Sequence, residues 1–216
     1  MRTPFAALVG LMMTCVCLPA QGSGLETEVA VYLKTGGEQP AALLGLLKRE
    51  AQALLRPAGV KLVWREFSET RLHEDFEAVV VARLDGSCAL AQDGSEPPAA
   101  RRPAPLAATP VQDGVILPFT TIDCDAVKRL TAALLGGEPG ARRDYLFGRA
   151  LGRVLAHEMY HILGQTQLHA DKGVAKPAFH ARELLSETFA FHEPAIMVMR
   201  AVAGEGAPPP SEAAGR

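Results

Sequence analysis

The chain lacks an excess of charge of either sign. Its 22 Lys and Arg residues nearly balance 24 Asp and Glu residues, for a formal net charge of −2. Such a balance excludes the basic surface that nucleic-acid-binding proteins need. The chain also lacks the low hydrophobicity of disordered proteins, because 48% of its residues are hydrophobic. With no internal repeat, the composition indicates a single soluble globular domain rather than a repeat array.

No hydrophobic run is long enough to cross a membrane as a helix. The longest, Phe5–Ala20, has 16 residues, whereas a spanning helix needs about 20. This run follows Arg2 and precedes small residues, which is typical of a secretory signal peptide. We predict a signal peptide over residues 1–22, with cleavage after Ala20 and an uncleaved anchor as the alternatives. The protein is therefore expected to be secreted or periplasmic, with no stable membrane insertion once the leader is removed.

Cysteine is scarce. Two of the four cysteines fall within the predicted leader, which leaves Cys88 and Cys124. An even pair in an exported protein predicts one disulfide, and two buried free thiols are the alternative. The pair does not have the C-x-x-C spacing of redox sites and zinc sites.

Strand patterns dominate the first half of the chain and helical patterns the second. Apolar alternation and short apolar runs predict strands at residues 28–34, 60–65, 76–83 and 115–122. Apolar residues at helical spacing predict helices at residues 41–56, 125–135, 142–163 and 181–192. This order indicates an α+β fold, in which a small mixed β-sheet with packed helices precedes a helical C-terminal part.

Two segments fall outside this pattern. Residues 85–114 are rich in Pro, Gly and Ala and are expected to form either a long surface loop or a flap that borders a cleft. Residues 204–216 have little to bury and are expected to form a flexible tail. A single domain over residues 23–203 remains.

The residues His157 to His161 read HEMYH and match the pattern H-E-x-x-H. On a helix, residues four apart lie on the same face, so the two imidazoles can bind one metal ion. Glu158 is rotated by about 100° from His157, a position from which it can take a proton from a water on that metal. The pattern predicts a metal site on the helix at residues 142–163, and a helix with two surface histidines is the alternative.

A third ligand is expected from the segment beyond this helix. Gly164 is predicted to adopt a positive φ and end the helix, which turns the chain away from the helix axis. His169 is then close enough in sequence to return to the metal. The alternative third ligands are Asp171, Glu183 and Glu187, whose other expected roles are a solvated helix face or salt bridges.

The sequence HEMYHILG, residues 157–164, resembles the active-site helix of zincin metallopeptidases. Its glycine resembles the metzincin branch of that family, H-E-x-x-H-x-x-G-x-x-H/D. The resemblance implies Zn²⁺ as the cofactor, His157 and His161 as zinc ligands, and Glu158 as the general base. It also implies a zincin-like fold around the helix.

This chain departs from the metzincin pattern after the helix. Gln167 stands at the position of the third ligand in that pattern, and His169 follows two residues later. The resemblance therefore implies a longer turn, with His169 as the third zinc ligand. Residues 195–197 (Ala-Ile-Met) faintly resemble the metzincin Met-turn beneath the metal, and simple core packing is the alternative.

These observations predict an exported zinc metalloendopeptidase. Its substrate is expected to be a protein or peptide that lies extended along an edge strand near the helix. The alternative from another class is a secreted binding protein on the same scaffold, which retains the metal but has little activity. The third hypothesis is an exported domain without a metal.

Overall fold

A five-stranded mixed sheet forms the frame of the protein, whose computed structural model describes residues 26–66, 76–90 and 105–205. The strand order is β2-β1-β3-β7-β4, in which β4 runs antiparallel to β7 and the other neighbours are parallel. The strands are β1 (Thr27–Thr35), β2 (Val60–Arg65), β3 (Ala78–Asp85), β4 (Ala107–Ala108) and β7 (Phe119–Asp123). A small hairpin of β5 (Val111–Gln112) and β6 (Val115–Ile116) connects β4 to β7.

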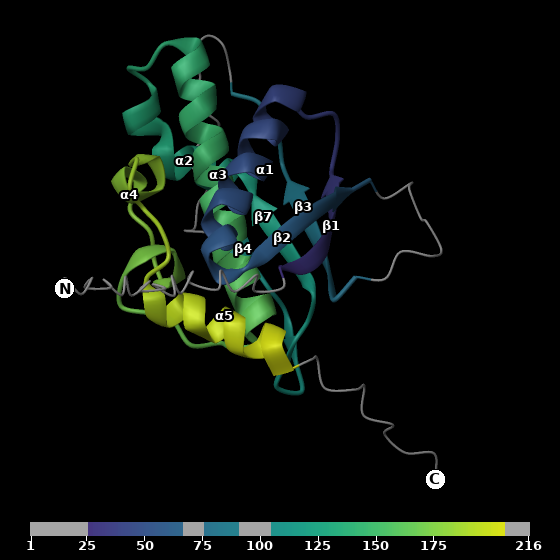
Figure 1. The fold of residues 1–216 in the computed structure, drawn as a ribbon. Coiled ribbons are helices and arrows are strands. Elements are labelled where there is room, and N and C mark those ends of the chain that lie inside the picture. Colours follow the sequence, from purple (N-terminus) through teal and green to yellow (C-terminus); the bar gives the residue numbers. More distant parts are fainter. Residues whose placement is uncertain (1–25, 67–75, 91–104, 206–216) are drawn as a thin grey trace, which may run out of the picture.

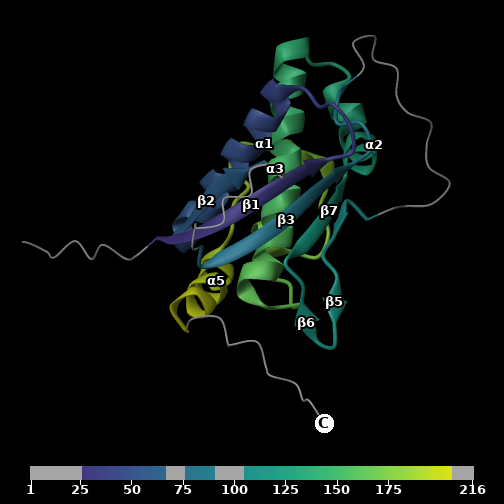
Figure 2. The same cartoon turned by 90° about the vertical axis from the view of Figure 1, so that its right-hand side faces the viewer.

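Helices α1 and α3 lie side by side on one face of this sheet (Figure 1, Figure 2). The helices are α1 (Ala41–Leu55), α2 (Cys124–Leu135), α3 (Gly140–Gly164), α4 (Ala181–Leu185) and α5 (Glu193–Glu205), with 3-10 turns at Arg56–Ala58 and Gly173–Ala175. The prediction of an α+β fold with a mixed sheet, a helix carrying HEMYH and a helical C-terminal part is confirmed. Among the described residues, no helix is both long enough and apolar enough to span a membrane.

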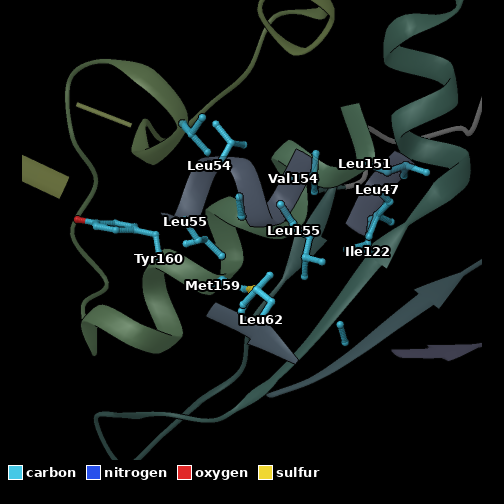
Figure 3. Packing of buried hydrophobic residues seen from close by; sticks show 14 of the residues in the cluster. Leu47, Leu54, Leu55, Leu62, Ile122, Leu151, Val154, Leu155, Met159 and Tyr160 are labelled. Carbon is cyan, nitrogen blue, oxygen red and sulfur yellow. The ribbon is translucent and has the colours of Figure 1, made fainter. Parts of the chain in front are cut away.

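The hydrophobic core lies between the sheet and the two long helices. Figure 3 shows buried side chains from α1, α3 and the sheet that converge there, among them Leu47, Leu55, Leu62, Ile122, Leu151, Leu155 and Met159. Because α3 is buried on every side from Leu146 to Tyr160, the helix is held rigidly, and so are the polar residues at its C-terminal end. Tyr160 is buried beside Phe191.

Two glycines let α3 approach α1 closely. A Cβ at Gly148 would lie 2.5 Å from the Leu46 Cβ, and one at Gly152 would lie 2.8 Å from the backbone oxygen of Leu47. Contacts this short do not occur in real structures, so a larger residue at either position would push the helices apart. The glycines thus set the position of α3 relative to the sheet.

Two arginines of α3 determine where α4 ends. Arg153 is 1% exposed, and its guanidinium bonds Glu50 at 2.8 Å and the backbone oxygen of Glu183 at 2.7 Å. Arg149 donates to the backbone oxygens of residues 185 and 186. Since these guanidinium groups satisfy the last carbonyls, the chain leaves the helix at Ser186, and the predicted helix over residues 181–192 is wrong beyond residue 185.

Pro118 divides the segment predicted as one strand over residues 115–122. Residues 115–116 form β6, and β7 starts at Phe119. Pro118 has no N–H for the ladder, although its backbone oxygen accepts a bond from Val81 N at 2.9 Å. The continuous strand is therefore wrong, because the segment turns before it joins the sheet.

The predicted disulfide between Cys88 and Cys124 is present, and both residues are fully buried. It links the segment after β3 to the start of α2. Asp123 caps α2 by accepting a bond from Ala126 N at 2.7 Å, which satisfies one of the unpaired N–H groups of the first turn. The predicted signal peptide lies outside the described residues, and so does the predicted tail beyond Glu205.

Candidate metal centre

Three histidines converge at the C-terminal end of α3. His157 and His161 lie one helical turn apart, and His169 comes from the segment that follows the helix. One ring nitrogen from each of the three lies within 4.8 Å of the other two. The structure therefore brings together the three residues that the sequence predicts as metal ligands.

The orientation of two of these rings is set by backbone carbonyl groups. His157 Nδ1 lies 2.7 Å from the oxygen of Val174, and His161 Nδ1 lies 2.7 Å from the oxygen of Thr166. A carbonyl oxygen can only accept a hydrogen bond, so each Nδ1 carries the proton in the neutral ring. Each Nε2 then has a free lone pair, which is the arrangement that metal-binding histidines show.

The two free lone pairs face each other. His157 Nε2 and His161 Nε2 are 3.1 Å apart, close to the distance of about 3.3 Å expected for two nitrogens bound tetrahedrally to one zinc ion at 2.0–2.1 Å. Two lone pairs at this separation repel each other unless a cation or a proton lies between them. The residues present therefore fit a zinc ion in both donor type and spacing.

Burial favours the neutral form of His157 and His169. His157 is 7% exposed, and burial lowers its pKa from 6.5 to about 4, although the hydrogen bond to Val174 acts in the opposite direction. Burial, together with the neighbouring His161, also lowers the pKa of His169. Because only a neutral imidazole binds a metal ion, the lowered pKa values of His157 and His169 keep these two ligands in the binding form near neutral pH. His169 is exposed and His161 partly buried, so the centre is accessible from solvent.

Glu158 is held from outside its own helix. It is 7% exposed, and its Oε2 accepts a hydrogen bond of 2.6 Å from the Thr109 hydroxyl. Burial raises the pKa of Glu158, while the bond from Thr109 and the proximity of His161 lower it. The carboxylate thus lies beside the histidines with one of its oxygens anchored.

The turn after α3 differs from the predicted one. Gly164 is the last helical residue, and Gln165 instead takes the left-handed conformation, with φ of 43°. Gln165 is held there because its side-chain amide donates to the backbone oxygen of Ile162 at 2.7 Å. A Cβ at Gly164 would lie 2.8 Å from Val198 Cγ1, so a glycine is needed at this position for packing against α5.

The alternative third ligands lie elsewhere. Asp171 is exposed and is not part of the histidine cluster. Glu183 pairs with Lys176 at 2.5 Å and also accepts from His180 N. Glu187 lies 3.8 Å from an Arg142 nitrogen. His180 precedes α4 as its N-cap residue. His73 falls outside the described residues.

The Met-turn that residues 195–197 faintly resemble is not formed, and the alternative of core packing does not hold for Met197 either. Residues 195–197 lie in the first turns of α5, and the Met197 side chain is 52% exposed. A helical, exposed methionine does not form a floor beneath the histidines. Phe179 contacts His157 instead, with an edge-on ring packing at 5.1 Å between centroids.

Sequence reasoning missed three contributors to the site, namely Thr109, Val174 and Thr166. The latter two act through backbone oxygens, which carry no residue-specific signal. The glycine at position 173 was a partial sequence signal for an unusual backbone conformation next to Val174. Gly173 adopts φ of 71°, and a Cβ there would collide with the backbone oxygen of Ala190. Thr109 lies in the segment at residues 85–114, for which a flap bordering a cleft was one of the two expectations.

No known protein family and no characterised protein matches this sequence. Among solved structures, the chain is similar to the crystal structure of archaemetzincin from Methanopyrus kandleri. The two share 12% sequence identity and a TM-score of 0.48, over 84% of this chain and 98% of that one. A likeness this slight assigns neither a family nor an activity, so the function is argued from the residues of the site.

Proposed function

We propose that the protein is an exported zinc-dependent peptidase. His157, His161 and His169 would hold the zinc ion, and Glu158 would act as the general base. The observation that carries this proposal is the convergence of three imidazole nitrogens within 4.8 Å, beside a buried carboxylate. Three protein ligands are the number typical of catalytic zinc sites, whereas structural sites use four.

A zinc ion held by these residues would polarise a carbonyl group as a Lewis acid. It would also lower the pKa of a water molecule. The chain's own contribution is orientation. The carbonyls of Val174 and Thr166 hold the rings of His157 and His161 in the tautomer that exposes Nε2. These hydrogen bonds to the ring nitrogens that face away from the metal position fix the ligand directions before a metal binds.

Glu158 provides the proton acceptor. Its side chain is almost fully buried, which raises its pKa and makes the carboxylate a better base than one in water. The proton of the attacking water passes to this carboxylate and from there to the leaving amine. The anchored Oε2 limits rotation of the group, so the other oxygen keeps a constant direction.

The substrate is expected to be a peptide in extended conformation. β4 lies at one edge of the sheet and packs close to α3. Within the described residues, the outer side of β4 has no strand partner, so a peptide can add there by backbone hydrogen bonds. Such a peptide would run past the C-terminal end of α3, where the histidines lie.

Export is supported by the cysteine chemistry. The Cys88–Cys124 disulfide is typical of proteins in oxidising compartments and rare in the reducing cytosol. Together with the predicted leader over residues 1–22, it favours a secreted or periplasmic protein.

The variant Glu158→Gln tests the proposal most simply. Glutamine has the same shape but cannot accept the proton, so kcat/KM on a peptide library should fall by about 100- to 10,000-fold while zinc content stays unchanged. Glu187→Gln is the matched control, because Glu187 is exposed and lies outside the site, and it should retain full activity. A Glu158→Gln protein as active as wild type would overturn the mechanism. A zinc-loaded wild type without any hydrolysis would favour the binding-protein alternative.

A further inference from the structure

The contact between Thr109 and Glu158 joins two segments that are 49 residues apart in sequence. A carboxylate without a proton can only accept, so the Thr109 hydroxyl is the donor. The distance of 2.6 Å is typical of a bond from a hydroxyl to an ionised carboxylate, which is stronger than one between neutral groups. The pair is therefore a specific and directional contact.

The backbone around Thr109 is fixed independently of Glu158. Pro110 follows it and confines Thr109 to extended backbone conformations, and the backbone oxygen of Pro110 accepts a bond from Leu117 N at 3.0 Å. On the other side, the Thr120 hydroxyl lies 3.3 Å from the backbone oxygen of Ala108. Because both flanks of Thr109 are held, its hydroxyl is placed before Glu158 binds it.

The two carboxylate oxygens of Glu158 have different surroundings. Oε2 accepts the Thr109 hydroxyl, whereas Oε1 has no hydrogen-bond partner among the described residues. A carboxylate held by one oxygen cannot rotate freely about its side-chain bonds. The free oxygen is then the one available to take a proton.

We propose that Thr109 is a positioning residue that anchors Oε2 of Glu158, so that Oε1 faces the attacking water. This inference rests on the proposed peptidase function and adds the residue that orients its base.

The anchor also couples the base to the substrate. Thr109 directly follows β4, the edge strand along which the peptide is proposed to lie. A single short segment then positions both the scissile peptide and the group that activates the water. A small error in such positions reduces the rate strongly, so the effect of losing the anchor should appear in kcat rather than in KM.

The test compares Thr109→Val with Thr109→Ser in the zinc-loaded protein. Valine has nearly the same shape but no hydroxyl, and kcat on a peptide substrate should fall by about 10- to 100-fold. KM and zinc affinity should stay within about twofold of wild type. Serine restores the donor, so its kcat should stay within about threefold of wild type. Thr131→Val is the matched control. This variant also loses a buried hydroxyl, one that is hydrogen-bonded within α2, and it should keep the wild-type kcat.

Any other result of this comparison would contradict the inference. An unchanged kcat in Thr109→Val, or a serine variant as slow as valine, would show that the hydroxyl does not act through Glu158. A rise in KM alone would make Thr109 a substrate contact, and a loss of zinc would make its role structural. A zinc-loaded wild type that cleaves no peptide would overturn the proposed function itself, and the inference with it.

Discussion

His157 Nδ1 lies 2.7 Å from the backbone oxygen of Val174, a residue 17 positions further along the chain. Val174 belongs to the same loop as His169, and a bond of 2.9 Å from Ala170 N to Ala175 O closes that loop. One loop therefore contributes the third histidine and orients the first. His169 reaches the cluster although it lies two residues beyond Gln167, the position that corresponds to the third ligand in the metzincin pattern.

Replacing His169 by alanine should weaken zinc binding by about 100-fold or more, because loss of a direct ligand costs more than the roughly 10- to 100-fold lost with a residue that only hydrogen-bonds a ligand. Asp171→Ala should bind zinc like the wild type, since Asp171 lies outside the cluster. Titration against a chelator of known zinc affinity measures both. Equal losses in the two variants would point to a general disturbance of the loop.

The zinc-free protein should lose stability as the pH falls below about 6.5. In the folded state burial lowers the pKa of His157 to about 4, whereas in the unfolded chain the value is about 6.5. Between these values the unfolded state binds a proton that the folded state does not, so unfolding becomes easier by about 2 kcal/mol from pH 7 to pH 5. Urea unfolding across this range measures the slope.

The matched variants for this pH effect are His157→Gln and His192→Gln. His157→Gln removes the titrating group and should flatten the slope. His192 is exposed, and its replacement should leave the slope as in the wild type. A slope that does not change in His157→Gln would assign the acid sensitivity to other groups.

The disulfide should contribute measurably to stability. It closes a loop with a sequence separation of 36, for which the chain-entropy estimate is about 3–4 kcal/mol. The double variant Cys88→Ser/Cys124→Ser should therefore unfold at a clearly lower urea concentration. A thiol titration of the denatured wild type without reductant should find neither of these cysteines free, and two free thiols per mature chain would contradict an exported, oxidised protein.

Gly152→Ala should destabilise the protein even though alanine favours helices. The new Cβ would lie 2.6 Å from the Glu50 Cβ and 2.8 Å from the backbone oxygen of Leu47, neither of which can move aside cheaply. A net loss of about 1–3 kcal/mol is expected. Gly45→Ala in α1 is the control, because its Cβ would meet only the end of the Arg49 side chain at 3.4 Å, and it should gain up to about 1 kcal/mol. A stable Gly152→Ala protein would contradict the close helix approach.

The sequence predicted correctly those helices and strands whose ends are set by residues adjacent to them in the sequence. The alternation over residues 60–65 coincides with β2, because the Gly59 turn before it has φ of 78° and stops the preceding helix. The HEMYH histidines also follow from local geometry, since a spacing of four places both on one helix face.

The features that the sequence did not predict depend on contacts within the folded chain. α4 ends early because Arg149 and Arg153, 30 to 37 residues away, bind its last carbonyls. Gln165 makes the turn and bonds the backbone oxygen of Ile162, whereas Gly164 is needed for packing against Val198 of α5. Thr109 has no motif at all, and only the folded chain places it against Glu158.

The zinc content of the untagged protein after exhaustive dialysis tests the central claim most directly. The account predicts about one zinc ion per chain in the wild type and none in the double variant His157→Ala/His161→Ala. A wild-type protein that retains no zinc, even after reconstitution with the metal, would contradict the proposed metal centre and the peptidase function built on it.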